Sequence, residues 1–298
     1  MKIGIAGTGR MGTAMALRLL DQGHRVMVWN RTRDRTDTAA AAGASVAGGA
    51  AALAADCGCI ISSLTDESAM HAVYTGPDGL LSGDVAGRVF IEMSTVRGTE
   101  HQALAPKIEA KGALLLECPV SGTVKPAREG TLVGFAGGTP KAFAKALPVL
   151  VPLCRRVELI GGMGAGARMK LAVNLLLTVF WQALAEACEL MRGVPIEPAR
   201  LIELFADSNI AAGILRTRGA AITAALEGQL AAAPSSFDID FMRKDLRQML
   251  QDAAALETGL PLAAQTLTCF DQASRAGAGR IDGTEYPAWW SNRTRAGA

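Results

Sequence analysis

The sequence lacks any long block of charge of one sign. Its 30 lysines and arginines are offset by 28 aspartates and glutamates, which leaves a formal net charge of +2. Extended basic blocks are typical of segments that bind nucleic acid or an anionic membrane surface, so neither partner is expected. Disorder is also excluded, because half of the residues are hydrophobic and only 19% are charged. The 298 residues suffice for two domains with buried cores.

The sequence also lacks the ligand spacings of a metal site. Its three histidines, His24, His71 and His101, are scattered, and Cys57-Gly58-Cys59 has neither the CxxC spacing nor a second pair. The six cysteines lie mostly in apolar stretches, which is typical of buried thiols in a reducing compartment. A strand predicted from residue 2 leaves no room for a signal peptide. We therefore expect a cytoplasmic protein without a metal.

A clean membrane span is missing as well. Residues 169–187 are strongly apolar, but Lys170 and Asn174 interrupt them. About 20 uninterrupted apolar residues are needed to cross a bilayer. A buried helix between two domains is the better interpretation of this segment.

What the chain does contain is a glycine-rich turn directly behind an apolar strand. Ile3-Gly4-Ile5-Ala6 is followed by Gly7-Thr8-Gly9-Arg10-Met11-Gly12 and then by a helical pattern to residue 20. In such a unit Gly7 permits a tight turn, Gly9 lets a pyrophosphate approach the backbone, and Gly12 lets the helix pack closely on the strand. Glycines also gather in ordinary turns, but strand, spacing and helix occur here in the order that a phosphate cradle requires.

The end of the second predicted strand, residues 25–29, bears on the choice of cofactor. A carboxylate that binds a ribose normally stands about twenty residues past the glycines, and Asn30 stands there instead. Arg31, Thr32 and Arg33 follow, and they offer two guanidinium groups and a hydroxyl to a 2′-phosphate. This pattern favours NADP(H) over NAD(H) and argues against FAD or S-adenosylmethionine. A basic, solvated loop without a cofactor role is the alternative.

Periodicity divides the chain into two halves of different type. Short apolar segments alternate with amphipathic stretches in the first half, which predicts an α/β domain with a doubly wound, Rossmann-type parallel sheet over residues 1–162. A glycine-rich segment marks the predicted boundary, and residues 163–298 read as an all-α domain. Strands are predicted at 58–63, 88–93, 113–118, 131–136 and 156–160, and helices at 167–191, 198–205, 211–226, 241–256 and 262–275.

Several residues are candidates for chemistry. Lys170 and Asn174 stand four residues apart, so both project from one helix face, toward the cleft expected between the domains. A lysine in an apolar helix must reach solvent, pair with an acid or act, and partial burial would favour proton transfer near neutrality. Lys244 lies among other charged residues, so a solvated face is the alternative there. Three further segments follow predicted strands, where an open α/β sheet binds ligands: Leu64-Thr65, Ser94-Thr95 and Ser121-Gly122-Thr123.

Four segments in order resemble those of the β-hydroxyacid dehydrogenase family, which includes 3-hydroxyisobutyrate dehydrogenase and the glyoxylate and succinic semialdehyde reductases. The resemblance covers almost the whole chain, to about residue 280. The matching segments are Gly7-Thr8-Gly9-Arg10-Met11-Gly12, Glu117-Cys118-Pro119-Val120-Ser121-Gly122-Thr123, Gly166-Ala167-Arg168-Met169-Lys170-Leu171-Ala172-Val173-Asn174 and Lys244-Asp245-Leu246.

The resemblance implies a role for each candidate. Lys170 would be the general acid that protonates the carbonyl oxygen while hydride arrives from the nicotinamide, and Asn174 would orient it. Ser121, Gly122 and Thr123 would bind the substrate carboxylate. The remaining assignments are Lys244 near the nicotinamide and the substrate carboxylate, Gly7, Gly9, Arg10, Met11, Gly12, Asn30, Arg31 and Thr32 at the nucleotide, and Leu64, Thr65 and Thr95 as further dinucleotide contacts. Thr65 departs from the usual pattern, in which a leucine is followed by proline.

Other departures narrow the expected activity. Thr123 followed by Lys125-Pro126-Ala127 is more similar to the glyoxylate and succinic semialdehyde reductases than to 3-hydroxyisobutyrate dehydrogenases. Val173 replaces the histidine that a decarboxylating 6-phosphogluconate dehydrogenase would have, and Lys170 argues against an imine reductase. The aromatic tail around Trp289-Trp290 does not match the usual family ending. It would either pack against a partner subunit or close the core.

The resulting expectation is an NADPH-dependent reductase of a small carboxylate-bearing aldehyde or keto acid. A homodimer with interlocking helical domains is expected, because the long apolar helix leaves more hydrophobic surface than one subunit covers. Two alternatives stay open. One is an NAD-dependent dehydrogenase of the 3-hydroxyisobutyrate type, and the other is a cofactor-binding module without turnover.

Overall fold

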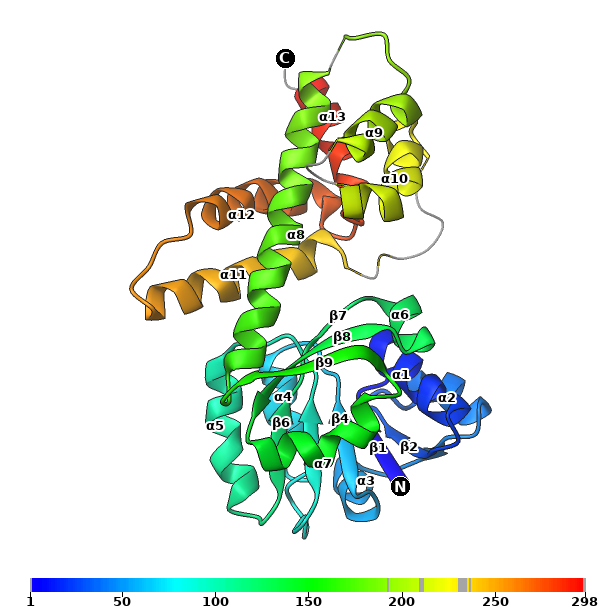
Figure 1. Cartoon of the computed structure of the whole chain (residues 1–298), viewed down its shortest axis with the longest axis vertical. Coiled ribbons are helices and arrows are strands. Elements are labelled where there is room, and N and C mark those ends of the chain that lie inside the picture. Colours follow the sequence, from blue (N-terminus) through cyan, green and yellow to red (C-terminus); the bar gives the residue numbers. More distant parts are fainter. Residues whose placement is uncertain (1, 192, 209–211, 230–234, 236, 297–298) are drawn as a thin grey trace. The chain divides into compact units, whose positions relative to one another are not determined.

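The structure, a computed structural model, describes residues 2–191, 193–208, 212–229, 235 and 237–296. It divides into two compact units, Met1–Val173 and Asn174–Ala298. We call them the sheet unit and the helical unit, and Figure 1 shows the elements of each. The division falls inside helix α8 (Ala165–Leu190). The boundary between residues 162 and 163, just before this helix begins, stays a prediction.

Among the described residues, nine strands of the sheet unit join in one sheet, in the order β3-β2-β1-β4-β5-β6-β8-β7 with β9 paired to β8. Strands β1 to β6 are parallel, whereas β8 is antiparallel to β6 and β7. The doubly wound sheet is therefore confirmed, and its last strands make it mixed. The strands are β1 (Lys2–Ala6), β2 (Arg25–Trp29), β3 (Ser45–Val46), β4 (Cys59–Ser62), β5 (Val89–Glu92), β6 (Leu114–Glu117), β7 (Val120–Ser121), β8 (Leu132–Gly138) and β9 (Cys154–Gly161).

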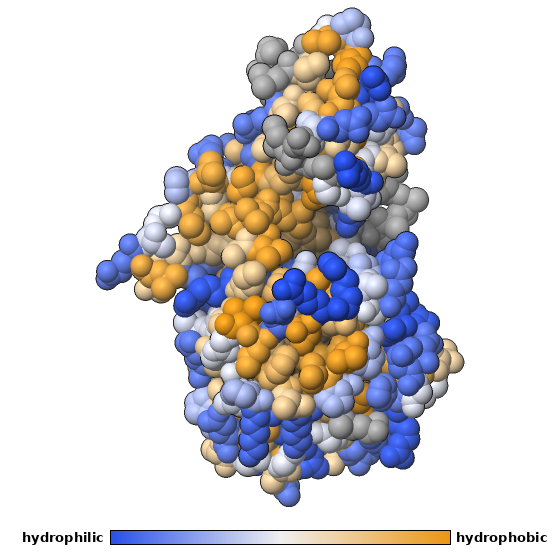
Figure 2. Space-filling model, in the orientation of Figure 1, coloured by the Kyte–Doolittle hydropathy of each residue, from blue (hydrophilic) through white to orange (hydrophobic). Residues whose placement is uncertain are grey.

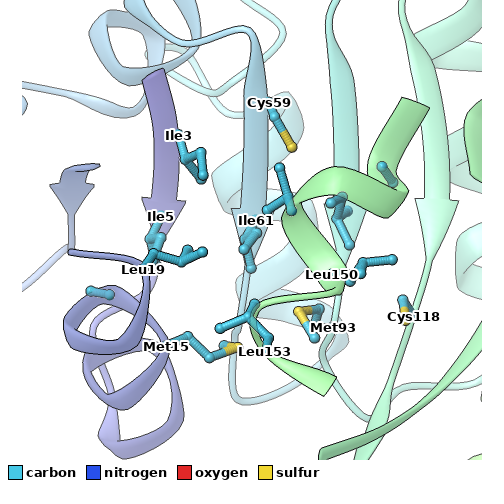
Figure 3. Packing of buried hydrophobic residues seen from close by; sticks show 14 of the residues in the cluster. Ile3, Ile5, Met15, Leu19, Cys59, Ile61, Met93, Cys118, Leu150 and Leu153 are labelled. Carbon is cyan, nitrogen blue, oxygen red and sulfur yellow. The ribbon is translucent and has the colours of Figure 1, made fainter. Parts of the chain in front are cut away.

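Helices cover both faces of this sheet, as the name doubly wound requires. One buried apolar cluster joins the sheet to α1 and α7, with Met15, Leu19 and Leu150 among its members (Figure 3). A second cluster on the other face packs Leu53, Tyr74 and the apolar side of α5 against β4 and β5. The helices are α1 (Arg10–Asp21), α2 (Asp37–Ala41), α3 (Ala50–Asp56), α4 (Glu67–Thr75), α5 (Gly98–Glu109), α6 (Val124–Glu129) and α7 (Pro140–Leu150).

Capping side chains explain where several of these helices begin. Asp66 Oδ1 accepts the N–H of Ala69 at 2.8 Å and starts α4, and Thr139 Oγ1 accepts the N–H of Ala142 at 3.1 Å and starts α7. Each such cap satisfies an N–H group that has no partner within its helix and contributes about 1 kcal/mol. Helix α1 begins differently, at Gly9, which has no side chain to offer. That difference positions the cofactor site described below.

In its described residues, the helical unit contains the C-terminal part of α8 and five further α-helices, which confirms the all-α prediction. They are α9 (Pro198–Asp207), α10 (Ala212–Leu226), α11 (Ile239–Ala255), α12 (Pro261–Ala273) and α13 (Tyr286–Ala296). Ala211, the predicted first residue of α10, lies outside the described residues. Helix α13 is unpredicted. Its Tyr286 is fully buried, packs edge-on against Phe270 and donates to Gln182 Oε1 at 2.8 Å, so this end of the tail closes the core.

Within the described residues, α8 is the one helix long and apolar enough to cross a membrane by length and composition. Core helices of soluble proteins pass the same test, and 44% of its apolar window is buried inside the structure. Most of the remainder is half-buried, and two large apolar side chains are exposed: Leu176 is 74% exposed and Met169 is 40% exposed. In the helical unit, apolar side chains gather over α8, α11 and α12 on the face shown in Figure 2.

Candidate active site

The glycine-rich turn between β1 and α1 packs tightly against other protein atoms at Gly7 and Gly12 and is open at Gly9. A Cβ at Gly7, which has φ +96°, would lie 2.3 Å from the carbonyl oxygen of Ser63. A Cβ at Gly12 would lie 1.9 Å from the carbonyl oxygen of Gly7, so α1 packs directly on the turn. At Gly9, by contrast, a Cβ would meet nothing within 4 Å. The open space at Gly9 is what the approach of a pyrophosphate requires.

The start of α1 is equipped for an anion. Gly9 provides no side-chain cap, and the first turn contains no acid. The first N–H groups of a helix lack partners within it, and the helix dipole favours negative charge there. Thr8 Oγ1 is buried beside this turn and has no hydrogen-bond partner in the described part of the chain. These features fit the pyrophosphate of a nicotinamide dinucleotide.

Asn30 ties the end of β2 to this cradle. Its Oδ1 accepts the N–H of Thr8 at 3.1 Å, and its Nδ2 donates to the carbonyl oxygen of Thr32 at 2.9 Å. Because both ends of the amide bind backbone groups, Asn30 braces the turn. Arg31 and Thr32 follow as exposed residues. A short 3₁₀ helix, Arg33–Thr36, then adds two more exposed arginines.

The segments after β4 and β5 are joined by a chain of hydrogen bonds. The N–H of Leu64 donates to Ser94 Oγ at 2.8 Å, and the N–H of Ser94 donates to Glu92 Oε1 at 2.7 Å. Thr95 follows as a half-buried residue. Thr65 is exposed, and its hydroxyl donates to Asp66 Oδ2 at 3.1 Å. The structure thus brings Leu64 close to the residue before Thr95, whereas the Thr65 hydroxyl is directed to the cap of α4.

Glu92 is the centre of this network, and it was not among the residues predicted from the sequence. It is fully buried, and Ser62 Oγ donates to its second oxygen. The Tyr74 hydroxyl lies 2.7 Å from Ser62 Oγ. Burial, reinforced by the charge of Glu92, raises the pKa of Tyr74 well above its usual value. The signal in the sequence is an acid at the end of an otherwise apolar strand, Val-Phe-Ile-Glu.

The predicted substrate segment forms a turn between β7 and α6. Ser121 and Thr123 are half-buried, and Gly122 between them is exposed with φ +123°. A Cβ at Gly122 would lie 2.7 Å from Leu132 Cδ2, so both the backbone conformation and the space require glycine. The two hydroxyls therefore flank a turn whose backbone conformation favours glycine.

A second buried acid, Glu117, ends the strand just before this segment. Its Oε1 accepts the N–H groups of Gly164 at 2.5 Å and Gly166 at 3.0 Å, and its Oε2 accepts the N–H of Ala167 at 3.2 Å. His101 Nδ1 lies 2.8 Å from Oε2, and both side chains are fully buried. Glu117 thus holds the beginning of α8, the helix that carries Lys170.

Lys170 is half-buried on α8, four residues before Asn174. Residues four apart lie on one face of a helix, as predicted. Asn174 is only 3% exposed, and its Nδ2 donates to Asp245 Oδ2 at 2.7 Å. Lys244 Nζ lies 3.2 Å from the other oxygen of Asp245, which is 2% exposed. The helical unit therefore joins two predicted residues, Asn174 and Lys244, through a third whose part is not evident from the sequence.

In the described part of the chain, no three histidine, cysteine or acidic side chains lie close enough to hold a metal ion.

Comparison with known proteins agrees with this arrangement. Residues 2–162 match the NAD-binding domain of 6-phosphogluconate dehydrogenase, and residues 164–289 match the NAD-binding family of NADP-dependent 3-hydroxyisobutyrate dehydrogenase. The chain is 32% identical to 3-hydroxyisobutyrate dehydrogenase of Pseudomonas aeruginosa, covering 93% of each chain. It is 30% identical to glyoxylate/succinic semialdehyde reductase 1 of Arabidopsis thaliana, covering 95% of this chain and 96% of the relative.

A solved structure has the same fold. The 3-hydroxyisobutyrate dehydrogenase of Mycobacterium tuberculosis, determined with L-serine, superimposes with a TM-score of 0.83 at 27% identity and covers 96% of this chain and 97% of its own. The nucleotide cradle, the two family matches and these full-length relatives lead to one conclusion: the chain belongs to the β-hydroxyacid dehydrogenase family and is an oxidoreductase with a nicotinamide-dinucleotide-binding domain.

Proposed function

We propose that the protein uses NADPH to reduce a small aldehyde or keto acid that carries a carboxylate, with Lys170 as the general acid. The observation that carries the proposal is the pair Lys170 and Asn174, one turn apart on α8, in a chain whose nucleotide cradle is intact. The relatives support the substrate class, because glyoxylate, succinic semialdehyde and 3-hydroxyisobutyrate, the compounds for which they are named, all carry a carboxylate.

The preference for NADPH rests on the end of β2. An acid that would bind the ribose hydroxyls is replaced by Asn30, and the amide of Asn30 is already bound to backbone groups. Arg31, Arg33 and Arg35 are exposed directly after it. Guanidinium groups bind phosphate oxygens through short, charge-assisted hydrogen bonds. The 2′-phosphate of NADPH would therefore meet guanidinium groups at this position. The ribose hydroxyls of NADH would lack the carboxylate that normally binds them.

Proton transfer is assigned to Lys170. When bound, the nicotinamide supplies the hydride, and the protein must supply the proton for the carbonyl oxygen. An ammonium group that is half-buried can donate a hydrogen bond to that oxygen and then the proton itself. Asn174 orients this group: Asp245 can only accept hydrogen bonds, so it binds the NH₂ end of the amide, and the amide oxygen is the end left for the ammonium.

The substrate carboxylate is assigned to the turn Ser121-Gly122-Thr123 and to Lys244. Two hydroxyls and the N–H groups of a glycine turn offer neutral donors, and the ammonium of Lys244 offers charge. Asp245, at 3.2 Å, holds that ammonium and restricts its rotation. Donors of these two kinds are what a carboxylate requires.

The test is oxidation of NADPH and, separately, of NADH at equal concentration, with glyoxylate, succinic semialdehyde and methylmalonate semialdehyde. We expect turnover with at least one of these substrates and a higher kcat/KM with NADPH. Oxidation of 3-hydroxyisobutyrate with a clear preference for NAD⁺ would instead support the alternative of an NAD-dependent dehydrogenase of the 3-hydroxyisobutyrate type. Tight NADPH binding without turnover would contradict the proposed reaction and favour a binding module.

We also propose that the protein is a homodimer. The apolar side chains exposed along α8, Leu176 above all, support this, because monomers rarely leave such a surface to water. Sedimentation at micromolar concentration should give the mass of a dimer, and a single sharp boundary at the mass of one chain would contradict the proposal.

A further inference from the structure

Glu117 is a fully buried acid to which the proposed reaction gives no part. It ends the apolar strand Leu-Leu-Leu-Glu, and its two oxygens accept the N–H groups of Gly164, Gly166 and Ala167. The imidazole of His101, also fully buried, contacts the carboxylate at 2.8 Å. Every one of these partners belongs to the sheet unit.

Filling of space alone does not account for an acid at this place. A buried charge loses its hydration, and apolar residues of similar volume often replace buried ion pairs without loss of stability. Glu117 makes interactions that an apolar side chain cannot make: it satisfies N–H groups at the start of α8, which have no partners inside the helix, and its charge is favourable at the positive end of the helix dipole. What the carboxylate adds is a defined position for the first turn of α8.

That position is held tightly. A Cβ at Gly137 would lie 2.1 Å from Glu117 Oε1, and a Cβ at Gly166 would lie 2.2 Å from the carbonyl oxygen of Phe135. On the α5 side, a Cβ at Gly98 would lie 2.9 Å from Gly164 Cα. Glycines thus let three backbone segments close around the carboxylate, and any shift of the helix start would break its hydrogen bonds.

The first turn of α8 leads directly to the proposed acid. Lys170 follows Gly166 by four residues, so it lies on the same helix face, about 6 Å further along the axis. On the other side, Ser121 follows Glu117 by four residues along the chain. Glu117 is therefore hydrogen-bonded to the helix turn that precedes Lys170, and it lies four residues before Ser121 in the chain. One side chain thus links the proton donor to the substrate-binding turn.

We infer that Glu117 is a positioning residue for proton transfer: its carboxylate sets the first turn of α8 so that the Lys170 ammonium meets the reacting carbonyl oxygen. The inference rests on the proposed function. It concerns the path from Glu117 through the helix start to Lys170, and it gives Glu117 no contact with substrate or cofactor.

The experiment compares Glu117→Gln with Glu92→Gln. Both change a fully buried carboxylate at a strand end into an amide, so they are matched in burial and chemistry. Glu117→Gln places an NH₂ group against N–H donors, and we expect kcat to fall about 10- to 100-fold while KM for NADPH stays within about twofold. Glu92→Gln loosens the segments after β4 and β5, so we expect mainly a higher KM for NADPH.

The decisive readout is the same substitution in a Lys170→Ala background, measured in single turnovers with enzyme in excess. If Glu117 acts through Lys170, Glu117→Gln should lower the residual rate by less than about twofold there, because residues that act as one unit are not additive. An equal loss in both backgrounds would show a merely structural role and overturn the inference.

Two further outcomes are distinct. If Glu117→Gln does not fold, Glu117→Asp keeps the charge and withdraws the carboxylate by about one C–C bond, roughly 1.5 Å; it should show the same loss of kcat and the same non-additivity to a smaller degree. An active wild type whose folded Glu117 variants keep kcat overturns the inference alone. A wild type that binds NADPH without turnover overturns the proposed function, and the inference with it.

Discussion

Three buried acids around the candidate site are held by different means in the two units. In the sheet unit, backbone N–H groups at strand and helix ends donate to Glu92 and Glu117, which also have Ser62 and His101 as side-chain contacts. In the helical unit, Asp245 is held by the side chains of Asn174 and Lys244. A backbone N–H is removed only by substitution with proline, which also fixes φ, whereas a side-chain partner can be removed by an ordinary substitution.

This difference separates two ways of placing a functional group. The sheet unit places its groups through backbone segments packed against glycines, so its geometry depends on the fold as a whole. The helical unit places Lys244 and Asn174 through one shared carboxylate, so its geometry depends on pairs that can be dissected one by one. We therefore expect substitutions in the sheet unit to move the bound cofactor or the Lys170 side chain through the fold as a whole. In the helical unit we expect substitutions to affect only the side chains that share the Asp245 carboxylate.

The largest expected effect is at Lys170, which stands near the division between the two units. Lys170→Ala should lower kcat about 10²- to 10⁴-fold, the range that a positioned general acid contributes, while the Kd for NADPH changes little. Steady-state kinetics and titration of NADPH fluorescence measure the two quantities. Lys141→Ala, an exposed lysine on α7, is the matched control and should keep full activity. Unchanged kcat in the Lys170 variant would refute the assigned role.

The next effect tests the nucleotide end of the sheet unit. Arg31→Glu should lower kcat/KM for NADPH roughly 10- to 100-fold and leave that for NADH nearly unchanged, because the new carboxylate repels a 2′-phosphate and tolerates a ribose hydroxyl. Arg25→Glu makes the same charge change at the opposite end of β2 and should affect both cofactors equally little. If both variants reduce NADPH use alike, general electrostatics would explain the preference and Arg31 would have no specific part.

Both predictions start from patterns that are visible in the sequence. The alternation of apolar and amphipathic stretches predicted the long strands and helices within a few residues, and the glycine spacing predicted the cradle. The short strands β3 and β7 were missed, because two residues carry no periodicity and β3 lies in an alanine-rich segment. Helix α13 was missed because its tryptophans, asparagine and threonine are weak helix formers, so only their packing in the core makes it a helix.

The buried acids were missed for another reason. Glu117 meets Gly164 47 residues later, and Asn174 meets Asp245 71 residues later, so no local spacing reveals either contact. The mixed end of the sheet is equally hidden, since the direction of β8 depends on how the chain returns after β7. An acid that ends an apolar strand, as at Glu92 and Glu117, is the signal that sequence reasoning can use, because such an acid must find donors when it is buried.

A smaller effect is expected for the side-chain pair of the helical unit. A double-mutant cycle of Asn174→Ala and Asp245→Ala, read by urea denaturation followed in the helical unit through hydrogen exchange, should give a coupling free energy of about 1–2 kcal/mol. Each single variant leaves a buried polar group without its partner, and the double variant removes both. Additive free energies would mean that the 2.7 Å contact contributes nothing by itself.

The smallest expected effect compares the units through one thiol in each. Burial raises the pKa of Cys57 in the sheet unit and of Cys188 in the helical unit from 9.0 to about 11. Only about 10⁻³ of either thiol is ionised at pH 8, so iodoacetamide should label both slowly. Each rate is divided by the ionised fraction found by titrating that thiol, and the ratio of the two corrected rates then measures local opening. We expect Cys188 to react roughly threefold faster, because helices with an exposed apolar face open more readily than the link from α3 to β4, a strand paired on both sides in the sheet.

The pH dependence of the labelling rates is the control for this comparison of Cys57 and Cys188. The folded thiols keep their protons up to about pH 11 and the unfolded ones lose theirs near 9.0, so the stability that burial of a neutral thiol gives is complete below pH 9 and is lost as the pH rises toward 11. Labelling followed by peptide mass spectrometry from pH 7 to 8.5 should therefore raise both rates in parallel, about tenfold per pH unit, at a constant ratio. A ratio of one at every pH would mean that the two units open together, and the contrast between a backbone-held and a side-chain-held unit would then not extend to their dynamics.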